Sequence, residues 1–167
     1  MFVTAWQAYL KTLAVTSHNS SMTTNEYVCH TPDETFELGE NIAATLTGGE
    51  AILLFGGLGA GKTLLTKGIL HGLGYDVDEV TSPSFTLVNL YDTEHLRVYH
   101  IDLWRLDGGQ DIAAAVGLDE IFDDDSAVVI IEWAERLGSY VFPHDTLNVT
   151  INGDGDAPRC VTLETKS

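Results

Sequence analysis

Basic residues are scarce in this 167-residue chain, where eight lysines and arginines stand against 25 aspartates and glutamates and leave a formal charge of −17. Proteins that grip duplex nucleic acid use lysine and arginine to displace the counterions condensed on its backbone. A chain with so few cations repels phosphodiester groups over most of its surface. Any role in nucleic-acid chemistry is therefore expected to run through a partner.

Cysteine and long apolar runs are also lacking. The two cysteines, Cys29 and Cys160, lie far apart and form no CxxC or clustered Cys/His spacing, so neither a zinc site nor a disulfide framework is indicated. The apolar residues near the amino terminus are interrupted by Thr4, Gln7 and Lys11, which breaks the continuous stretch that a secretory signal needs. No run reaches the ~18 apolar residues of a membrane helix. These absences favour a soluble protein of a reducing compartment, the cytoplasm.

The hydrophobic content of 44% is enough for one compact core, and no linker is long enough to divide the chain. Residues 1–21 precede the first well-organised segment and are expected to be an N-terminal extension, which leaves 22–167 as a single domain. Continuous apolar runs at 51–55 and 127–131 predict strands covered on both faces, as in the parallel sheet of an α/β protein.

The other elements are predicted from caps, periodicity and turns. A helix is expected to begin after Thr31, because Pro32 suits the first helical position and Glu34 can return a hydrogen bond to the Thr31 amide. The remaining pattern predicts a helix at 64–70 and an antiparallel hairpin formed by 85–91 and 96–101. It also predicts short helices at 111–115 and 118–122, and two final edge strands at 147–151 and 160–163.

Residues 56–63, GGLGAGKT, fit the pattern G-x-x-x-x-G-K-[ST] in full and lie between a predicted strand and a predicted helix, as the motif requires. Glycines let such a loop fold tightly enough for consecutive backbone N–H groups to face a phosphate, and the helix amino terminus adds partial positive charge. Lys62 can then reach the β and γ phosphates, and the Thr63 hydroxyl can bind Mg²⁺. The alternative, a chance glycine turn, is disfavoured because strand, loop and helix are in register.

A nucleotide loop also needs carboxylates that hold the metal and orient water, at the carboxyl ends of neighbouring strands. Two acids qualify, because Asp102 follows the predicted strand 96–101 and Glu132 follows 127–131. For each of them the alternative is a solvated carboxylate at a strand exit, which is common in so acidic a chain. The position of both acids favours a functional role.

Hydroxyl groups occur in the connection after the P-loop helix, TSPSFT. In nucleotide switches this connection brings a hydroxyl to the metal, and Ser82, Ser84 and Thr86 are the candidates. The alternative is a loop whose hydroxyls only satisfy its own backbone. His100 shares a strand face with Asp102, but a packed or hydrogen-bonded histidine is the better interpretation.

The identity of the nucleotide follows from motifs that are missing. A Ras-like GTPase needs D-x-x-G at its second acidic site and a guanine-reading N/T-K-x-D, and the chain has neither. A small-molecule kinase needs clustered basic residues to hold phosphorylated products, and the few lysines and arginines are dispersed. ATP hydrolysis or ATP-dependent switching remains.

Five motifs in one order give a more specific signal than the P-loop alone. Together they resemble the TsaE family, bacterial P-loop ATPases required to form N6-threonylcarbamoyladenosine in tRNA, over roughly residues 31 to 163. The motifs are TFELGE at 35–40, LGAGKT at 58–63, SPSFTLV at 82–88, YHIDLWRL at 99–106 and IEWAER at 131–136.

The resemblance implies a P-loop NTPase of the α/β class, with central parallel strands flanked by antiparallel ones and helices on both faces. It also implies that the protein joins TsaD and TsaB, which transfer threonylcarbamoyl to the tRNA adenosine beside the anticodon. Contact with tRNA would be left mainly to these partners, and no membrane is involved. Mg²⁺-dependent ATP hydrolysis, slow without the partners, would reset the assembly.

Residue roles carry over from the same motifs. Lys62 and Asp102 would serve hydrolysis, while Thr63 and Glu132 would hold Mg²⁺. The nucleotide phosphates would be held by consecutive loop residues, namely Gly59, Ala60, Gly61, Lys62, Thr63 and Leu64.

Two contacts outside the loop are also implied. Glu34 or Thr35, at the first helix, would approach the base, and Arg159 would close over the nucleotide from the last strand. Two alternatives to the ATPase remain open, a docking module that uses ATP only to fix its shape and a small-molecule kinase.

The chain departs from the family pattern at three positions. The family usually has Asp where Gly57 stands, Thr where Ser84 stands and Tyr where Trp104 stands. Ser84 keeps a hydroxyl and Trp104 keeps an aromatic ring. Gly57 removes a carboxylate beside the phosphate loop, so we expect slow hydrolysis.

Overall fold

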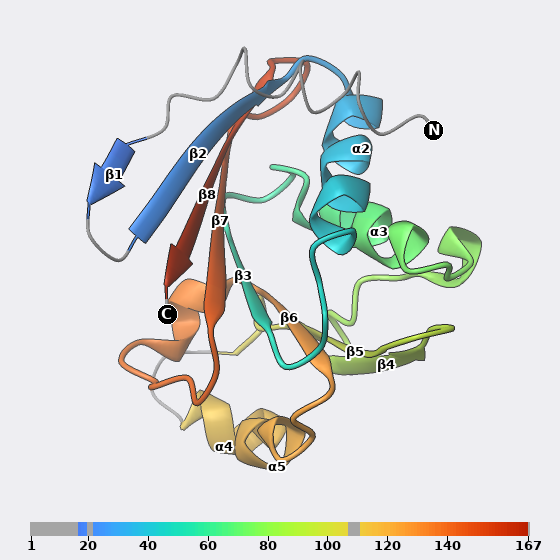
Figure 1. Ribbon diagram of the computed structural model, residues 1–167, viewed down its shortest axis with the longest axis vertical. Coiled ribbons are helices and arrows are strands. Elements are labelled where there is room, and N and C mark those ends of the chain that lie inside the picture. The colour runs from blue at the N-terminus through green and yellow to red at the C-terminus, as the bar shows by residue number, and fades with distance from the viewer. Residues whose placement is uncertain (1–16, 20–21, 107–110, 167) are drawn as a thin grey trace.

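The computed structural model describes residues 17–19, 22–106 and 111–166, whose strands form one mixed sheet (Figure 1). The strands are β1 Ser17–Asn19, β2 Met22–Cys29, β3 Ala51–Phe55, β4 Val88–Asp92, β5 Arg97–Asp102, β6 Val128–Glu132, β7 Thr146–Asn152 and β8 Arg159–Lys166. The helices are α2 Pro32–Ala43, α3 Lys62–Gly72, α4 Ile112–Val116 and α5 Leu118–Phe122, with 3₁₀ turns η1 Val77–Glu79 and η2 Ala134–Leu137.

The sheet has parallel strands at its centre and antiparallel strands on both sides. Its order across the described residues is β1-β2-β8-β7-β3-β6-β5-β4. Strands β7, β3, β6 and β5 run parallel. The pairs at either side, β1–β2, β2–β8, β8–β7 and β5–β4, are antiparallel. The α/β class, the flanked parallel centre and the β4–β5 hairpin predicted from the sequence are confirmed.

The last two strands are interior strands, so the prediction of two edge strands is wrong. Strand β7 lies between β3 and β8, and β8 lies between β7 and β2. The residues of β7 and β8 alternate between apolar and polar because one face of this half of the sheet is only partly covered, and partial cover resembles an edge in sequence. The sequence pattern does not predict β2, whose residues MTTNEYVC contain no apolar run.

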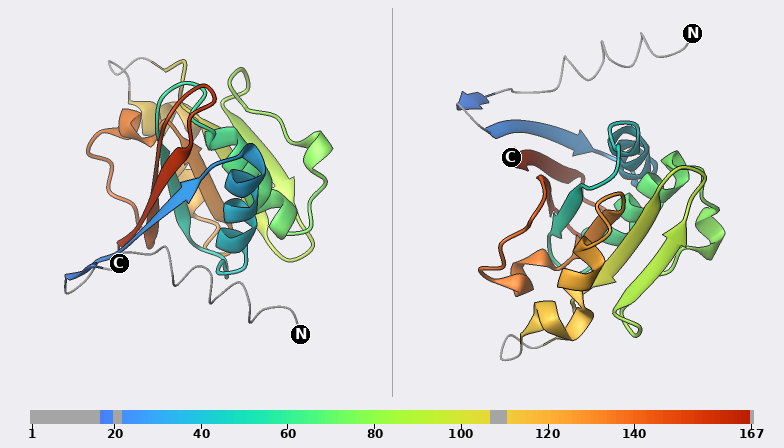
Figure 2. Two further views of the ribbon diagram at one scale, coloured as in Figure 1. Left: turned by 90° about the horizontal axis from the view of Figure 1, so that it is seen from above. Right: turned by 60° about the horizontal axis from the view of Figure 1, so that its bottom comes forward.

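Helices cover both faces of the central strands (Figure 2). Side chains of β3 alternate between two cores, since Ile52 and Leu54 face α2 and α3 while Ala51 and Leu53 face α4 and α5. Strand β6 is buried along its whole length. This double cover is what its continuous apolar run predicts.

Helix α2 begins at the predicted cap with one change of partner. The Thr31 hydroxyl accepts a hydrogen bond from the Glu34 amide at 3.2 Å, as expected. The Glu34 carboxylate accepts from the His30 amide at 2.6 Å, not from Thr31, so that part of the prediction is wrong. The carboxylate reaches one residue further back and ties the end of β2 to the helix start.

The N-terminal extension predicted at residues 1–21 lies largely outside the described residues. Its described part, β1, pairs with β2, matching Ser17 with Thr24. Within the ranges that the structure describes, no helix is long and apolar enough to cross a membrane.

Two glycines let α2 and α3 meet backbone to backbone. A Cβ placed on Gly68 would lie 2.1 Å from the Phe36 carbonyl oxygen, and one on Gly39 would lie 2.4 Å from the Leu65 carbonyl oxygen. These distances are far below van der Waals contact. Since α3 begins at Lys62, the contact with α2 sets the orientation of the amino-terminal turn of α3 at the site.

Gly68→Ala should therefore destabilise the protein. We expect the free energy of unfolding to fall by about 2 kcal/mol, because overpacking of the crossing outweighs the better helix propensity of alanine. Urea unfolding measures the change. Gly57→Ala is the matched control, since a Cβ at Gly57 meets no atom within 4 Å. Equal stability of the two variants would contradict the tight crossing.

Candidate functional site

The glycine-rich loop 56–63 connects β3 to α3, as the motif predicts. Three of its glycines take positive φ, Gly56 at 147°, Gly59 at 73° and Gly61 at 111°. L-residues with side chains rarely adopt these conformations, so the turn depends on glycine. Gly61 is also the N-cap of α3 and offers no side chain to satisfy the first amides of the helix.

The amides of this turn are available to a ligand. In the described part of the chain, the N–H groups of Gly59 and residues 61–64 have no hydrogen-bond acceptor, whereas the Leu65 amide bonds to the Gly61 carbonyl at 2.9 Å. Free amides at a helix amino terminus attract an anion through their own dipoles and that of the helix. The residues predicted to hold phosphates thus form a cradle of free donors except at Ala60, whose amide donates to the Gly57 carbonyl at 3.3 Å.

Lys62 lies at the centre of this turn and is only 5% exposed. Its ammonium group donates hydrogen bonds to the carbonyls of Gly56 at 2.7 Å and Gly57 at 2.9 Å, and lies 3.7 Å from the ring centroid of Trp133. Burial lowers the pKa of Lys62, while the nearby carboxylates of Glu132, Glu135 and Asp102 oppose that shift. The lysine is therefore a partly desolvated cation, held at the loop by hydrogen bonds to two uncharged backbone carbonyls.

The two predicted acids lie side by side. The parallel register of β5 and β6 pairs Asp102 with Glu132, and these side chains are 4% and 3% exposed. Both strands end at the edge of the sheet next to the loop, which is where parallel strands of an open α/β sheet present a binding site. The predicted position of both acids is confirmed, and their roles stay a prediction.

Thr63 and Glu132 together offer oxygen ligands for a hard metal ion. The Thr63 hydroxyl donates to the Glu132 carboxylate, with oxygen separations of 2.9 and 3.1 Å. Mg²⁺ prefers hydroxyl, carboxylate and phosphate oxygens, and it keeps several waters rather than an all-protein cage. The residues present therefore fit a magnesium ion bound together with a nucleotide.

His100 supports Glu132 from inside the sheet. Its Nε2 lies 2.8 Å from Glu132 Oε1, and its side chain is fully buried. The packed, hydrogen-bonded histidine expected from the sequence is confirmed, although its partner is Glu132 and not the same-face Asp102. Its other ring nitrogen, Nδ1, has no hydrogen-bond partner among the described residues.

The loop after α3 reaches Asp102 through serine. Ser82 donates a hydrogen bond to Asp102 Oδ2 at 2.7 Å, and the Trp104 amide donates to Oδ1 at 2.9 Å. The Ser84 hydroxyl lies 3.2 Å from that of Ser82. Thr86 instead donates to Asn89, so of the three candidate hydroxyls only the two serines line the site.

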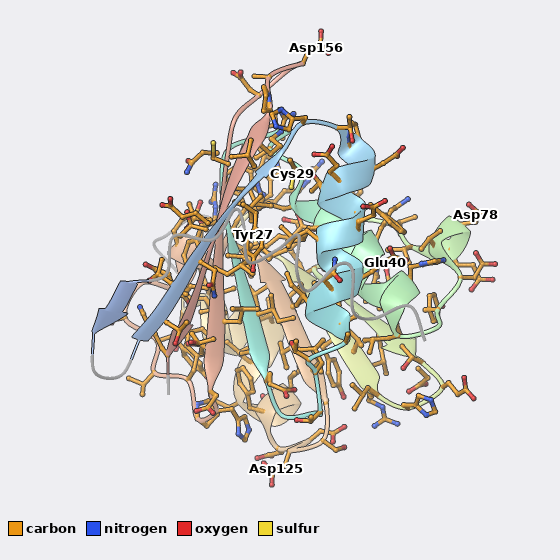
Figure 3. All side chains as sticks on the ribbon, turned by 45° about the horizontal axis from the view of Figure 1, so that its top comes forward. Tyr27, Cys29, Glu40, Asp78, Asp125 and Asp156 are labelled. Carbon is orange, nitrogen blue, oxygen red and sulfur yellow. The ribbon has the colours of Figure 1, made fainter. Side chains whose placement is uncertain are left out.

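Two adjacent cavities meet at the phosphate loop. One, of about 370 Å³, is lined by the loop, both serines, both acids and three further side chains, Trp104, Arg105 and Trp133. The other, of about 230 Å³, lies between the start of α2, the loop and the β7–β8 turn, whose tip carries Asp156 (Figure 3). The structure brings Thr35 and Arg159 to this second cavity, whereas Glu34 is not among its lining residues.

Arg159 holds the phosphate loop against the β7–β8 turn. Its guanidinium donates to the loop carbonyls of Ala60 at 2.9 Å and Gly59 at 3.4 Å. On the other side it donates to turn carbonyls of Asp154, Ala157 and Gly155. The predicted site residue is thus a brace for the loop in this structure.

Arg159→Ala should loosen the loop without removing a phosphate donor. We expect ATP affinity to fall about tenfold, or about 1.4 kcal/mol, because part of the free energy of ATP binding would then be used to order the loop. Arg159→Lys should restore little, since an ammonium cannot span five carbonyls as the planar fork does. Calorimetric titration measures both variants. Full affinity in Arg159→Lys would show that charge alone matters.

Sequence reasoning gave no role to Trp133. It adopts a positive φ of 60°, directly after Glu132, and this turn brings its ring to within 4.5 Å of the Trp104 ring centroid. The two indoles, with Lys62 over one of them, form the aromatic wall of the larger cavity. The only available signal is the E-W dipeptide at the end of a buried strand.

The loop, its buried lysine and the paired acids on a central parallel sheet define a P-loop nucleotide-binding protein. Residues 29–161 match the family model described as threonylcarbamoyl adenosine biosynthesis protein TsaE. The chain belongs to the TsaE family of tRNA threonylcarbamoyladenosine biosynthesis proteins.

Individual relatives agree with this membership. The TsaE of Bacillus subtilis is 37% identical over 132 residues, which cover 79% of this chain and 80% of the relative. The TsaE of Treponema pallidum is 32% identical over 81% of this chain and 97% of its own length. The crystal structure of Bacillus subtilis YdiB superposes with a TM-score of 0.69 at 32% identity, over 90% of each chain.

Proposed function

We propose that this protein is a Mg²⁺-dependent ATPase that supports threonylcarbamoyl transfer to tRNA together with TsaB and TsaD. The observation that carries the proposal is the contact of Thr63 with Glu132 at the start of α3, beside free loop amides and the buried Lys62. These groups supply anion donors, a cation and metal ligands in one cavity. A role in tRNA modification implies action in the cytoplasm.

Each side chain has a distinct task in this proposal. Thr63 and Glu132 hold magnesium, which when bound neutralises charge on the phosphate oxygens. Lys62 exchanges its two carbonyl acceptors for phosphate oxygens, a stronger charge-assisted contact. Asp102 keeps lone pairs free beyond its bonds to Ser82 and the Trp104 amide, and so orients the attacking water.

The two cavities match the two halves of a nucleotide. Polar and charged groups surround the larger cavity, where the phosphates would lie. The smaller cavity, which is lined by Thr35 and Arg159, would receive the base and sugar. No described lysine or arginine besides Lys62, Arg105 and Arg159 lines either cavity, so a second phosphorylated substrate would find few cations. This favours water over a metabolite as acceptor.

A partner surface lies at the rim of the same site. Leu58 at the loop is 74% exposed and Phe85 is 83% exposed, and Phe85 stacks with the guanidinium of Arg105, 4.2 Å from its ring centroid. Exposed apolar groups rimmed by charge are typical of interaction sites. Because the chain as a whole is strongly acidic, a basic partner surface would be attracted to it.

Phosphate release with and without the TsaB–TsaD pair tests the proposal. We expect slow hydrolysis by the protein alone and a severalfold or greater rise with the partners. Phe85→Asp should abolish the rise and leave basal hydrolysis intact, because Phe85 lines neither nucleotide cavity. Turnover absent under both conditions would favour the ATP-dependent docking module, and phosphoryl transfer to a metabolite would favour the kinase.

A further inference from the structure

One apolar groove of the described residues lies apart from the nucleotide site. This groove, of about 450 Å³, lies between α2 and the strands β2, β8 and β7, and is called the β2–α2 groove here. It shares no lining residue with the two cavities at the phosphate loop. Its apolar side chains are Tyr27, Leu38, Ile42, Leu46, Leu147 and Leu163.

The groove exists because the sheet is wider than its helical cover. Figure 3 shows Tyr27 on β2 beside the helix that carries Glu40. Tyr27, Leu147 and Leu163 remain only half-buried although they pack against the main core. Covering an apolar strip of this kind with a further apolar element lowers the free energy of the folded state.

Residues 1–16 have the pattern of such an element. At 100° per residue, six large apolar side chains fall on one side of a helix and Thr4, Gln7 and Lys11 fall on the other, while Met1 and Val15 lie outside the apolar side. The apolar members are Phe2, Val3, Trp6, Tyr9, Leu10 and Leu13. A helix of this length spans ~24 Å, comparable to the ~26 Å of an eight-residue strand such as β2.

The connection to the domain starts at the groove. The β1–β2 register places Ser17 beside Thr24, whose neighbours Thr23 and Asn25 both line the groove. Ser17, the first residue of β1, therefore lies on the strand next to β2, which forms a wall of this groove. No long linker is needed to bring residues 1–16 onto the groove.

Charge favours the same contact. The segment carries Lys11 and no acidic residue, in a chain with a net charge of −17. Two carboxylates, those of Glu50 and Asp145, and one ammonium group, that of Lys166, lie at the groove, which leaves an excess of negative charge there. The matched family region begins only at residue 29, so the segment and nearly all of β2 are additions to the part of the chain that the family model covers.

We propose that residues 1–16 form an amphipathic helix that docks its apolar side into the β2–α2 groove of the same chain. The helix adds the layer that this half of the sheet lacks. Docking covers the side chains of Tyr27, Leu147 and Leu163, and holds β2 at the start of α2, where Thr35 reaches the smaller nucleotide cavity.

Hydrogen exchange of the full chain without nucleotide tests this proposal independently of the ATPase. We expect amides in 1–16 to exchange at least tenfold more slowly than in the synthetic peptide of the same sequence. Leu10→Glu should abolish that protection, because it places a charge on the apolar side. The matched variant Gln7→Glu, on the polar side, should keep it.

Variants in the groove link the protection to this place. Thr165→Arg should release the segment, since Thr165 is exposed and lines the groove, whereas Glu164→Arg on the other face of β8 should not. Monomers with protection at all concentrations, checked by sedimentation, support docking in the same chain. Exchange at peptide rates, or protection that appears only with dimers, overturns the proposal.

Discussion

Lys62→Ala is expected to lower ATP affinity by about 100-fold or more. In the structure the ammonium group already pairs with two carbonyl oxygens, so binding exchanges neutral acceptors for charged phosphate oxygens. Charge-assisted hydrogen bonds contribute about 1.5–3 kcal/mol each, and the low exposure of Lys62 limits screening by solvent. Isothermal titration with ATP and Mg²⁺ measures the loss.

The control for this experiment lies one turn further along the same helix. Lys67→Ala removes an equal charge from α3, but Lys67 lines neither nucleotide cavity, so its ATP affinity should stay within about twofold of the parent. Circular dichroism separates loss of binding from loss of fold in both variants. Unchanged affinity in a folded Lys62→Ala protein would exclude a phosphate-binding role for this lysine.

The local parts of the site could be predicted from the sequence because they are encoded by neighbours along the chain. The loop needs only its glycines, Lys62 and Thr63, all within eight consecutive residues that lead into α3. The pairing of Asp102 with Glu132 is non-local, yet it follows from one rule: parallel strands end at the same edge of a sheet. The sequence therefore predicted the positions of these residues better than the contacts that support them.

The support depends on contacts that no local pattern encodes. Arg159 bonds to the Ala60 carbonyl across 99 positions, and a backbone carbonyl leaves no trace in residue type. His100 contacts Glu132 because β5 and β6 are adjacent, so its partner becomes known only with the register. Trp133 reaches the site through a positive φ that is uncommon outside glycine.

The antiparallel side of the sheet was likewise predicted only in part, because its pairing depends on distant segments of the chain. Strand β7 could be recognised as a strand but not as an interior one, since its neighbours β3 and β8 come from distant parts of the chain. Strand β2 was missed because its polar residues Thr23 and Asn25 face an open groove, where polar side chains cost little. Half-covered strands carry too little apolar periodicity to be separated from loops or edges by sequence alone.

Asp102→Asn should lower the rate of ATP hydrolysis at saturation by about 100-fold or more and leave ATP affinity within about threefold. The amide has the shape of the carboxylate, and it can still accept from the Trp104 amide and donate to the Ser82 hydroxyl. The fold and the cradle are therefore preserved. What is lost is the negative charge that orients water and receives its proton.

This split between rate and affinity assigns Asp102 to water and not to the cradle. Single-turnover hydrolysis and calorimetry, measured on one preparation, separate the two quantities. Asp92→Asn is the matched control, because Asp92 lies on β4 and pairs with Arg97 at the opposite end of the hairpin from Asp102. An equal loss of affinity and rate would assign Asp102 to the nucleotide or metal. A rate within a few-fold of the parent would leave hydrolysis to Glu132 or to a partner residue, and would remove Asp102 from the catalytic site.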